Sequence, residues 1–215
     1  MDIVREQVRI GPLGLAGCFD LVAPADGLVV FAHGSGSSHL SPGNQQLAGL
    51  LHQHRLCTLL FDLLSPAEAT DRHKVFDIEL LASRIGQAID WARLHPAVGG
   101  GGLALFGAST AAAAALCAAA ARPSRVMAVV SLGGRPDLVS VDLPAVQAPT
   151  LLVVGAHDPQ LLDLNRRAMR LLRCEKRLEV VPGAGQRFDA PGVLDSVAHL
   201  AGAWFSNHLS AGWRS

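Results

Sequence analysis

The chain has 215 residues, half of them hydrophobic and 17% charged, so it can bury the core of one α/β domain over residues 1–215. Lysine plus arginine equals aspartate plus glutamate at 18 each, and no basic face or acidic tail stands out, which argues against nucleic acid or a charged membrane surface as partner. The absence of a long apolar run or a signal-peptide pattern favours a soluble, cytoplasmic protein with a small-molecule ligand.

Short apolar segments alternate with helical patterns along the chain. The first 24 residues, which turn at Gly11-Pro12, predict an antiparallel hairpin at one edge of a sheet. Uniformly apolar strands predict a mainly parallel central sheet flanked by helices on both faces, an α/β fold. The predicted strands are 27–33, 57–63, 102–107, 126–132, 150–155 and 177–182, and the predicted helices are 41–55, 76–95, 111–121, 161–173 and 191–209. Fewer than twenty residues separate Leu132 from Thr150, too few for a lid domain, so an open site is expected.

A glycine-rich segment, HGSGSS, follows the first buried strand at residues 33–38. Glycines at a strand end let a backbone amide point toward the carboxyl edge of the sheet, which is what an oxyanion hole needs. Ser35 N–H is the predicted donor, while His33 is interpreted as ordering this loop or contacting substrate. A phosphate-binding loop would need Gly-Lys-Ser/Thr, and a dinucleotide site would need a third glycine and an acidic residue. Both become minor alternatives, and no cofactor is expected.

The stretch LFGASTAAAAAL, residues 105–116, runs from a strand end into a helix of alanines and carries the candidate nucleophile Ser109. Gly107 and Ala111 leave room for the tight turn of a nucleophile elbow, in which the serine backbone is strained. Thr110 N–H, at the start of the helix, is the second predicted oxyanion donor. A serine before an alanine-rich helix is also a good helix cap, and this alternative stays open on the local sequence alone.

The acid of a catalytic triad is predicted at Asp158, just past a strand that follows the serine strand. Chain order serine, aspartate, histidine is that of α/β-hydrolases. A helix cap is again the alternative, because Pro159 can open the next helix. Asp137 is a weaker candidate for the same acid. Arg135 is placed to bind a substrate carboxylate or, equally, to pair with Asp137.

The remaining polar groups are interpreted as structural. The cysteines are widely spaced without a CxxC pair, so neither a disulfide framework nor a metal site is predicted. The polar loop 65–76 is expected to be mobile over the cleft, with solvated charges. Surface or packing roles are expected for His52, His54, His95, His199 and His208.

With these motifs in place, the chain resembles the α/β-hydrolase superfamily and, within it, the small lidless dienelactone hydrolase-like proteins. The resemblance covers nearly the whole chain. It is carried by LVVFAHGSGSS, LFGAST, APTLLVVGAHD and RLEVVPGAG, which occur in the family's order. The sequence is most similar to a bacterial subgroup that also occurs fused to phosphoribosyltransferase domains.

The resemblance implies a catalytic histidine after the last strand, within Gly-Ala-x-His and an aromatic residue. This sequence has PGAGQRFDAPGVL there, which puts Gln186 in the histidine position. An amide has no useful basicity near neutral pH and cannot shuttle a proton. Three explanations are open: an isolated substitution in a working enzyme, a substitute base at His157 or His39, or a pseudoenzyme.

These observations predict a serine hydrolase that acts on a small carboxylic ester or lactone. Ser109 would attack the carbonyl, the Ser35 and Thr110 amides would hold the oxyanion, and Asp158 would orient a base, with Gln186 impairing the reaction. The competing hypothesis is a catalytically silent protein that binds a small ligand or a protein partner in the same cleft. A homo-oligomer is compatible with either function.

Overall fold

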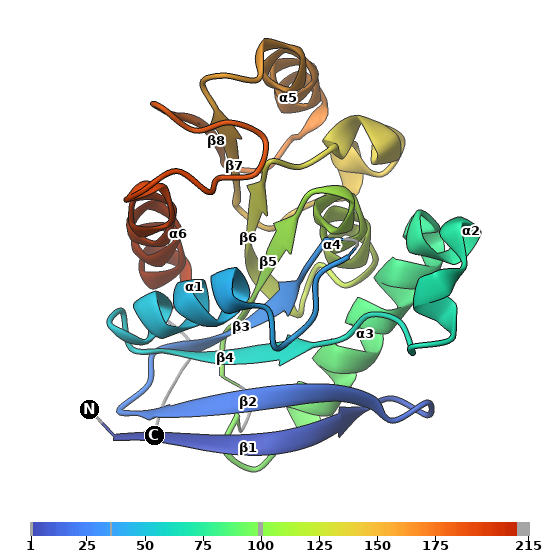
Figure 1. Ribbon diagram of the computed structural model, residues 1–215, viewed down its shortest axis with the longest axis vertical. Helices are drawn as coiled ribbons and strands as arrows, with labels where there is room; N and C mark the ends of the chain where they lie inside the picture. The colour runs from blue at the N-terminus through green and yellow to red at the C-terminus, as the bar shows by residue number, and fades with distance from the viewer. Residues whose placement is uncertain (1, 35, 99–100, 210–215) are drawn as a thin grey trace.

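The computed structural model describes residues 2–34, 36–98 and 101–209 and is built around one eight-stranded sheet (Figure 1). The strand order is β1-β2-β4-β3-β5-β6-β7-β8. Strands β3 to β8 are parallel to one another, whereas β1 and β2 form an antiparallel hairpin, and β2 pairs antiparallel with β4. The strands are β1 Asp2–Ile10, β2 Leu15–Ala23, β3 Gly27–Ala32, β4 Leu56–Phe61, β5 Leu103–Ala108, β6 Val126–Leu132, β7 Thr150–Gly155 and β8 Lys176–Val181. The prediction of a mainly parallel α/β sheet with an edge hairpin is confirmed.

Helices cover both faces of the sheet. One buried core packs α3, α4 and α5 against one face, and a second core packs α1 and α6 against the other. Alternate side chains of β3 enter the two cores, Val30 the first and Val29 the second, which explains why the strand is apolar throughout. The helices are α1 Pro42–His52, α2 Arg72–Val75, α3 Ile78–Leu94, α4 Thr110–Ala121, α5 Pro159–Leu171 and α6 Val193–Leu209. None of the helices in the described part of the chain is long and apolar enough to cross a bilayer.

The last strand differs from its prediction as a buried strand. β8 lies at the edge of the sheet, and it pairs with β7 on one side only. Arg177 and Val180 are exposed, and only Val181 of its residues is fully buried. A short apolar run therefore indicates a strand, but it does not indicate how many faces of that strand are buried.

The register brings the carboxyl ends of the central strands to one edge. Ala32 of β3 pairs with Gly107 of β5, which pairs with Ser131 of β6. The loops that leave these strands therefore start side by side. In a parallel α/β sheet, this edge is where ligands bind.

Candidate active site

The turn at Ser109 has a strained backbone. β5 ends at Ala108, α4 begins at Thr110, and Ser109 between them has φ 54° and ψ −130°. A positive φ is uncommon for a residue with a side chain and costs free energy. The Ser109 backbone N–H donates to Leu132 O at 3.0 Å, which ties the turn to β6. The serine side chain is exposed and makes no capping hydrogen bond, so helix capping does not account for its position.

Small residues bring α4 close to the sheet at this turn. A Cβ built on Gly107 would lie 2.6 Å from Ala112 Cα and 3.0 Å from Ala115 Cβ. Ala112 and Ala115 are themselves completely buried. The alanine run therefore lets the helix pack closely enough for the serine turn to form.

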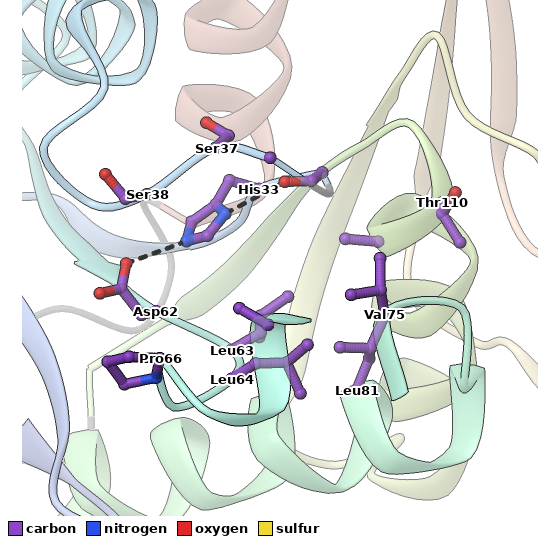
Figure 2. A pocket seen from close by; sticks show the side chains of 14 residues that line it. His33, Ser37, Ser38, Asp62, Leu63, Leu64, Pro66, Val75, Leu81 and Thr110 are labelled. Atoms are coloured by element: carbon purple, nitrogen blue, oxygen red, sulfur yellow. Dashed lines mark hydrogen bonds and ion pairs between the residues drawn. The ribbon is translucent and has the colours of Figure 1, made fainter. Parts of the chain in front are cut away.

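A cavity of about 340 Å³ lies beside the turn, and Figure 2 shows its lining. Thr110 and Ala111, at the start of α4, form part of its wall. Gly34 also lines the cavity and lies close to the serine, because a Cβ built on Gly34 would be 3.1 Å from Ser109 Cβ and 3.7 Å from Ser109 Oγ. The other lining residues are His33, Gly36, Ser37, Ser38, Asp62, Leu63, Leu64, Pro66, Ala69, Val75 and Leu81.

Of the two predicted oxyanion donors, Thr110 and Ser35, Thr110 belongs to the described part of the chain. Thr110 lies at the first position of α4 and lines the cavity. Backbone N–H groups in the first turn of a helix have no intrahelical acceptor, and the helix dipole is positive there, so this end suits an oxyanion. Ser35 lies outside the described residues.

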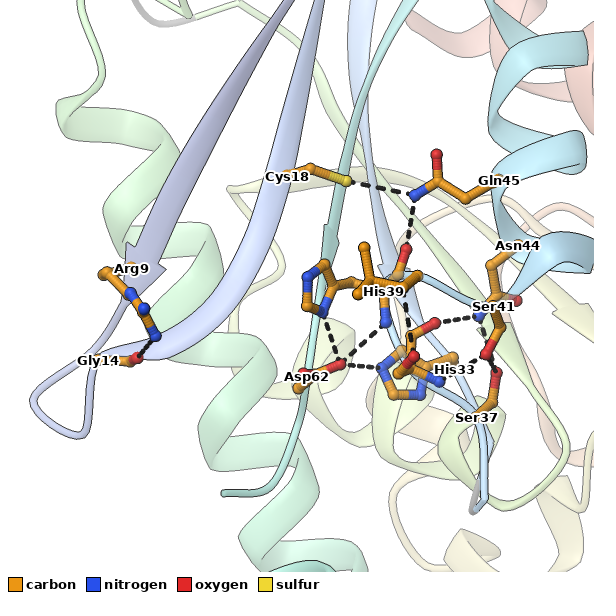
Figure 3. A network of polar contacts seen from close by, with 12 residues as sticks. Arg9, Gly14, Cys18, His33, Ser37, His39, Ser41, Asn44, Gln45 and Asp62 are labelled. Carbon is orange, nitrogen blue, oxygen red and sulfur yellow. Dashed lines mark hydrogen bonds and ion pairs between the residues drawn. The ribbon is translucent and has the colours of Figure 1, made fainter. Parts of the chain in front are cut away.

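Asp62, which follows β4, is the centre of a polar cluster beside the cavity (Figure 3). Its Oδ1 lies 3.0 Å from His39 Nδ1, 2.9 Å from the His39 backbone N and 3.5 Å from His33 Nε2. Burial alone would raise the pKa of the Asp62 carboxyl, but the contact from the His33 ring, the hydrogen bond from the His39 backbone N–H and the contact from the His39 ring lower that pKa to about 2. Asp62 is therefore an anion throughout the physiological range.

Sequence reasoning missed Asp62. The segment CTLLFDL predicts a buried strand, and the aspartate near its end is a signal for the ligand edge of a parallel sheet. His33, a candidate from the sequence, is buried and lines the cavity, with Nδ1 3.4 Å from Gly34 O.

The charges of the loop 65–76 differ from their prediction as solvated groups. The loop contains a short 3₁₀ helix, Glu68–Thr70, and the helix α2. The Glu68 carboxylate lies 3.1 Å from Arg84 on α3 and 3.6 Å from Lys74, so these charges are paired rather than simply solvated. The pairing holds the loop against α3, where it forms one wall of the cavity.

Neither histidine proposed as a substitute base borders the cavity. His39 is buried, and its Nδ1 faces Asp62. His157 has an exposed side chain, and its backbone N–H donates to Ala184 O at 3.0 Å. His33 is the histidine that lines the cavity together with Thr110.

Asp158 and Gln186 lie on adjacent loops, but no hydrogen bond joins them among the described residues. Asp158 Oδ1 accepts from Leu161 N at 3.0 Å, the helix-cap contact considered from the sequence. A Cβ on Gly155 would touch the carbonyl oxygens of Ala184 and Gly185, so the two loops are in contact. Gln186 is exposed, and its backbone carbonyl oxygen lies 3.8 Å from a Cβ built on Gly133. Gly133 directly follows Leu132, whose carbonyl accepts the hydrogen bond from Ser109 N–H.

The Arg135 guanidinium pairs with its near neighbour Asp137. Its Nε and Nη2 donate to the two carboxylate oxygens at 2.8 Å and 2.7 Å. This bidentate contact raises the pKa of Arg135 and lowers that of Asp137. Of the two roles considered for Arg135, the pairing with Asp137 is the one present, and neither residue lines the cavity.

The sheet order, the strained serine turn and the cavity at the carboxyl edge define an α/β-hydrolase fold. No family model matches the chain. The crystal structure of a dienelactone hydrolase from Anabaena variabilis superimposes with a TM-score of 0.92 at 46% identity, over 97% of this chain and 98% of that one. A dienelactone hydrolase-like promiscuous phosphotriesterase from metagenomic libraries shares the fold, with a TM-score of 0.77 at 18% identity over 97% and 99% of the two chains.

Longer relatives also contain this domain. Proteins from two Mycobacterium tuberculosis strains, whose name is that of a phosphoribosyl transferase, are 49% identical over 203 residues. The match covers 94% of this chain but only 46% of theirs, so the chain spans about half the length of these curated relatives. Together with the 46% identity to the Anabaena enzyme over nearly both full chains, this shows that the chain belongs to the dienelactone hydrolase-like family of α/β-hydrolases.

Proposed function

We propose that this protein is a serine hydrolase of small carboxylic esters or lactones whose proton-transfer step is impaired by Gln186. One observation carries the proposal: Ser109 is exposed on a backbone with φ 54°, at the start of a helix and beside a cavity. Backbone strain of this kind persists at sites where it positions a reacting group. Membership of the hydrolase family supports the same interpretation.

The proposed reaction proceeds through an acyl-enzyme. Ser109 Oγ forms a bond to the carbonyl carbon, and the oxyanion is held at the N-terminus of α4, where Thr110 N–H is available. The C–O bond to the leaving group then breaks, and the alcohol leaves with a proton. Water attacks the ester and releases the acid and the free serine. Formation and hydrolysis of the acyl-enzyme both need a group that accepts a proton and returns it, and the Gln186 amide is not such a group.

The first test compares short-chain p-nitrophenyl ester hydrolysis by the protein and by Gln186→His. A positioned general base contributes roughly 10²–10⁴-fold, so kcat/KM is expected to rise on the order of a hundredfold or more in Gln186→His. Gln186 is exposed, so the substitution leaves the core intact. Gln186→Asn is the matched control, and it is expected to stay at the level of the original protein.

Ser109→Ala in each background identifies the nucleophile. Turnover that survives Ser109→Ala, or no Ser109-dependent turnover in any variant, would contradict the hydrolase proposal. The silent binding protein would then become the better hypothesis. Intact-mass detection of Ser109 labelling by a fluorophosphonate separates the two functions independently, because a reactive serine is expected only in the hydrolase.

A further inference from the structure

The cavity has two chemically different ends. Figure 2 shows Thr110 on one side and Asp62 on the other, with Leu63, Leu64 and Leu81 between them. Thr110 follows the candidate nucleophile directly, so the reacting carbonyl belongs at that end. The acyl group of a bound ester would then extend along the leucines, with its far end toward Asp62.

The described lining residues include no lysine or arginine, and the groups that face Asp62 are the imidazoles of His33 and His39. Lys74 on α2 and Arg84 on α3 are both paired with Glu68. The short contacts from His33 and His39 fall on Asp62 Oδ1. Because the Asp62 side chain is 28% exposed, a ligand in the cavity meets a carboxylate that is only partly covered.

We propose that Asp62 makes this site selective for esters whose acyl group is uncharged, and that acyl groups ending in a carboxylate are excluded. The inference rests on the proposed function and names its substrate class. A carboxylate at the far end would lose water to apolar walls and would face a like charge, with no arginine or lysine to receive it. An uncharged aliphatic chain instead gains contact with the leucines. The cavity volume of about 340 Å³ is near the lower limit of ordinary ligand pockets, which suits small acyl groups.

Two matched esters test the selectivity in the Gln186→His background. p-Nitrophenyl hexanoate and mono-p-nitrophenyl adipate have acyl chains of equal carbon number and differ in a terminal methyl against a carboxylate. Rates in the same background with Ser109→Ala are subtracted to remove uncatalysed hydrolysis. We expect kcat/KM to favour hexanoate on the order of tenfold or more.

Two variants assign the preference to charge. Asp62→Asn keeps an oxygen acceptor but removes the charge, and the hexanoate-to-adipate ratio is expected to fall severalfold. Ala69→Lys adds a cation at an exposed lining position, leaves the Asp62 contacts untouched, and is expected to lower the same ratio. Each ratio is measured on one preparation, so differences in the folded fraction cancel.

The outcomes separate the inference from the function. Ser109-dependent hydrolysis of both esters with a ratio near one, or with a ratio that neither variant changes, would overturn the selectivity and leave the hydrolase intact. If neither ester shows Ser109-dependent hydrolysis, both the selectivity and the hydrolase function are overturned.

Discussion

Ser109 has a backbone conformation that its neighbours in β5 and α4 do not share. Such a conformation costs roughly 1–3 kcal/mol and needs support from its surroundings. The support here comes from the hydrogen bond to Leu132 O and from Gly107, where a side chain would strike α4. The local sequence identified this residue, because a small residue on each side of a serine at a strand end is a local pattern.

Asp62 is the residue whose ionisation is coupled most clearly to folding. Its pKa of about 2 lies below the ordinary value of 3.8, so its contribution to stability is present above pH 4 and is lost as pH falls toward 2. The difference corresponds to about 2 kcal/mol. The titratable groups that face it are His33 and His39.

We expect the free energy of unfolding to depend less on pH in Asp62→Asn than in the original protein. The free energy of unfolding of the original protein should fall between pH 4 and pH 2 by about 2 kcal/mol more than that of Asp62→Asn. Urea denaturation at a series of pH values measures both curves. Asp163→Asn, at an exposed surface ion pair, is the control and should follow the original protein. Parallel curves for all three proteins would show that the Asp62 contacts do not stabilise the folded state.

At the scale of the element, α4 sets the distance between the sheet and the serine turn. Its residues from Ala111 to Leu116 are all buried, and Ala115 is in contact with the position where a Gly107 side chain would be. A run of alanines is low in sequence complexity, but here each small side chain has a packing role.

Enlarging one of these alanines is therefore expected to disturb the site. Ala115→Leu should destabilise the protein by about 1–3 kcal/mol through overpacking and should reduce fluorophosphonate labelling of Ser109. Ala121→Leu makes the same change at the exposed end of α4 and should alter stability by less than about 0.5 kcal/mol. Thermal unfolding and intact-mass labelling measure the two effects. Equal behaviour of the two variants would contradict the spacing role of α4.

Features set by neighbouring residues could be predicted from the sequence, whereas contacts between distant segments could not. Strands such as β3 were predictable because burial on both faces makes every residue apolar, whereas the edge position of β8 depends on pairing that no local pattern records. The cluster at Asp62 joins the loop between β3 and α1 to the end of β4. The pairing of Glu68 with Arg84 likewise spans two elements. Contacts of this kind depend on the completed fold.

At the scale of the whole molecule, a buried carboxylate links the two strands of the N-terminal hairpin to each other and to α1. Asp20 on β2 is completely buried and accepts two hydrogen bonds from Arg5 on β1, both at 2.6 Å. His52 on α1 lies 3.6 Å from the same carboxylate, and burial lowers the pKa of that imidazole. The hairpin, the sheet and one helix thus meet at a single carboxylate.

Removing the arginine is expected to destabilise the molecule. Arg5→Leu leaves the buried Asp20 carboxylate without its main partner and should cost about 3 kcal/mol. Arg9→Leu, on the same strand at an exposed position, is the matched control and should cost less than about 0.5 kcal/mol. Chemical denaturation of both variants tests this expectation, and a small loss in Arg5→Leu would mean that water replaces the guanidinium.

The two free edges of the sheet have a consequence for how copies of the protein meet. With equal numbers of acidic and basic residues, the molecule has no net charge near pH 7 to keep copies apart at long range. An unpaired strand edge is a template for pairing with another chain. β1 presents Arg5, Glu6 and Arg9 along its edge, and β8 presents Arg177 and Glu179. Protection of these edges against pairing with another copy therefore falls to these few charged side chains, since Ile3, Val4 and Val180 are exposed on the same two strands.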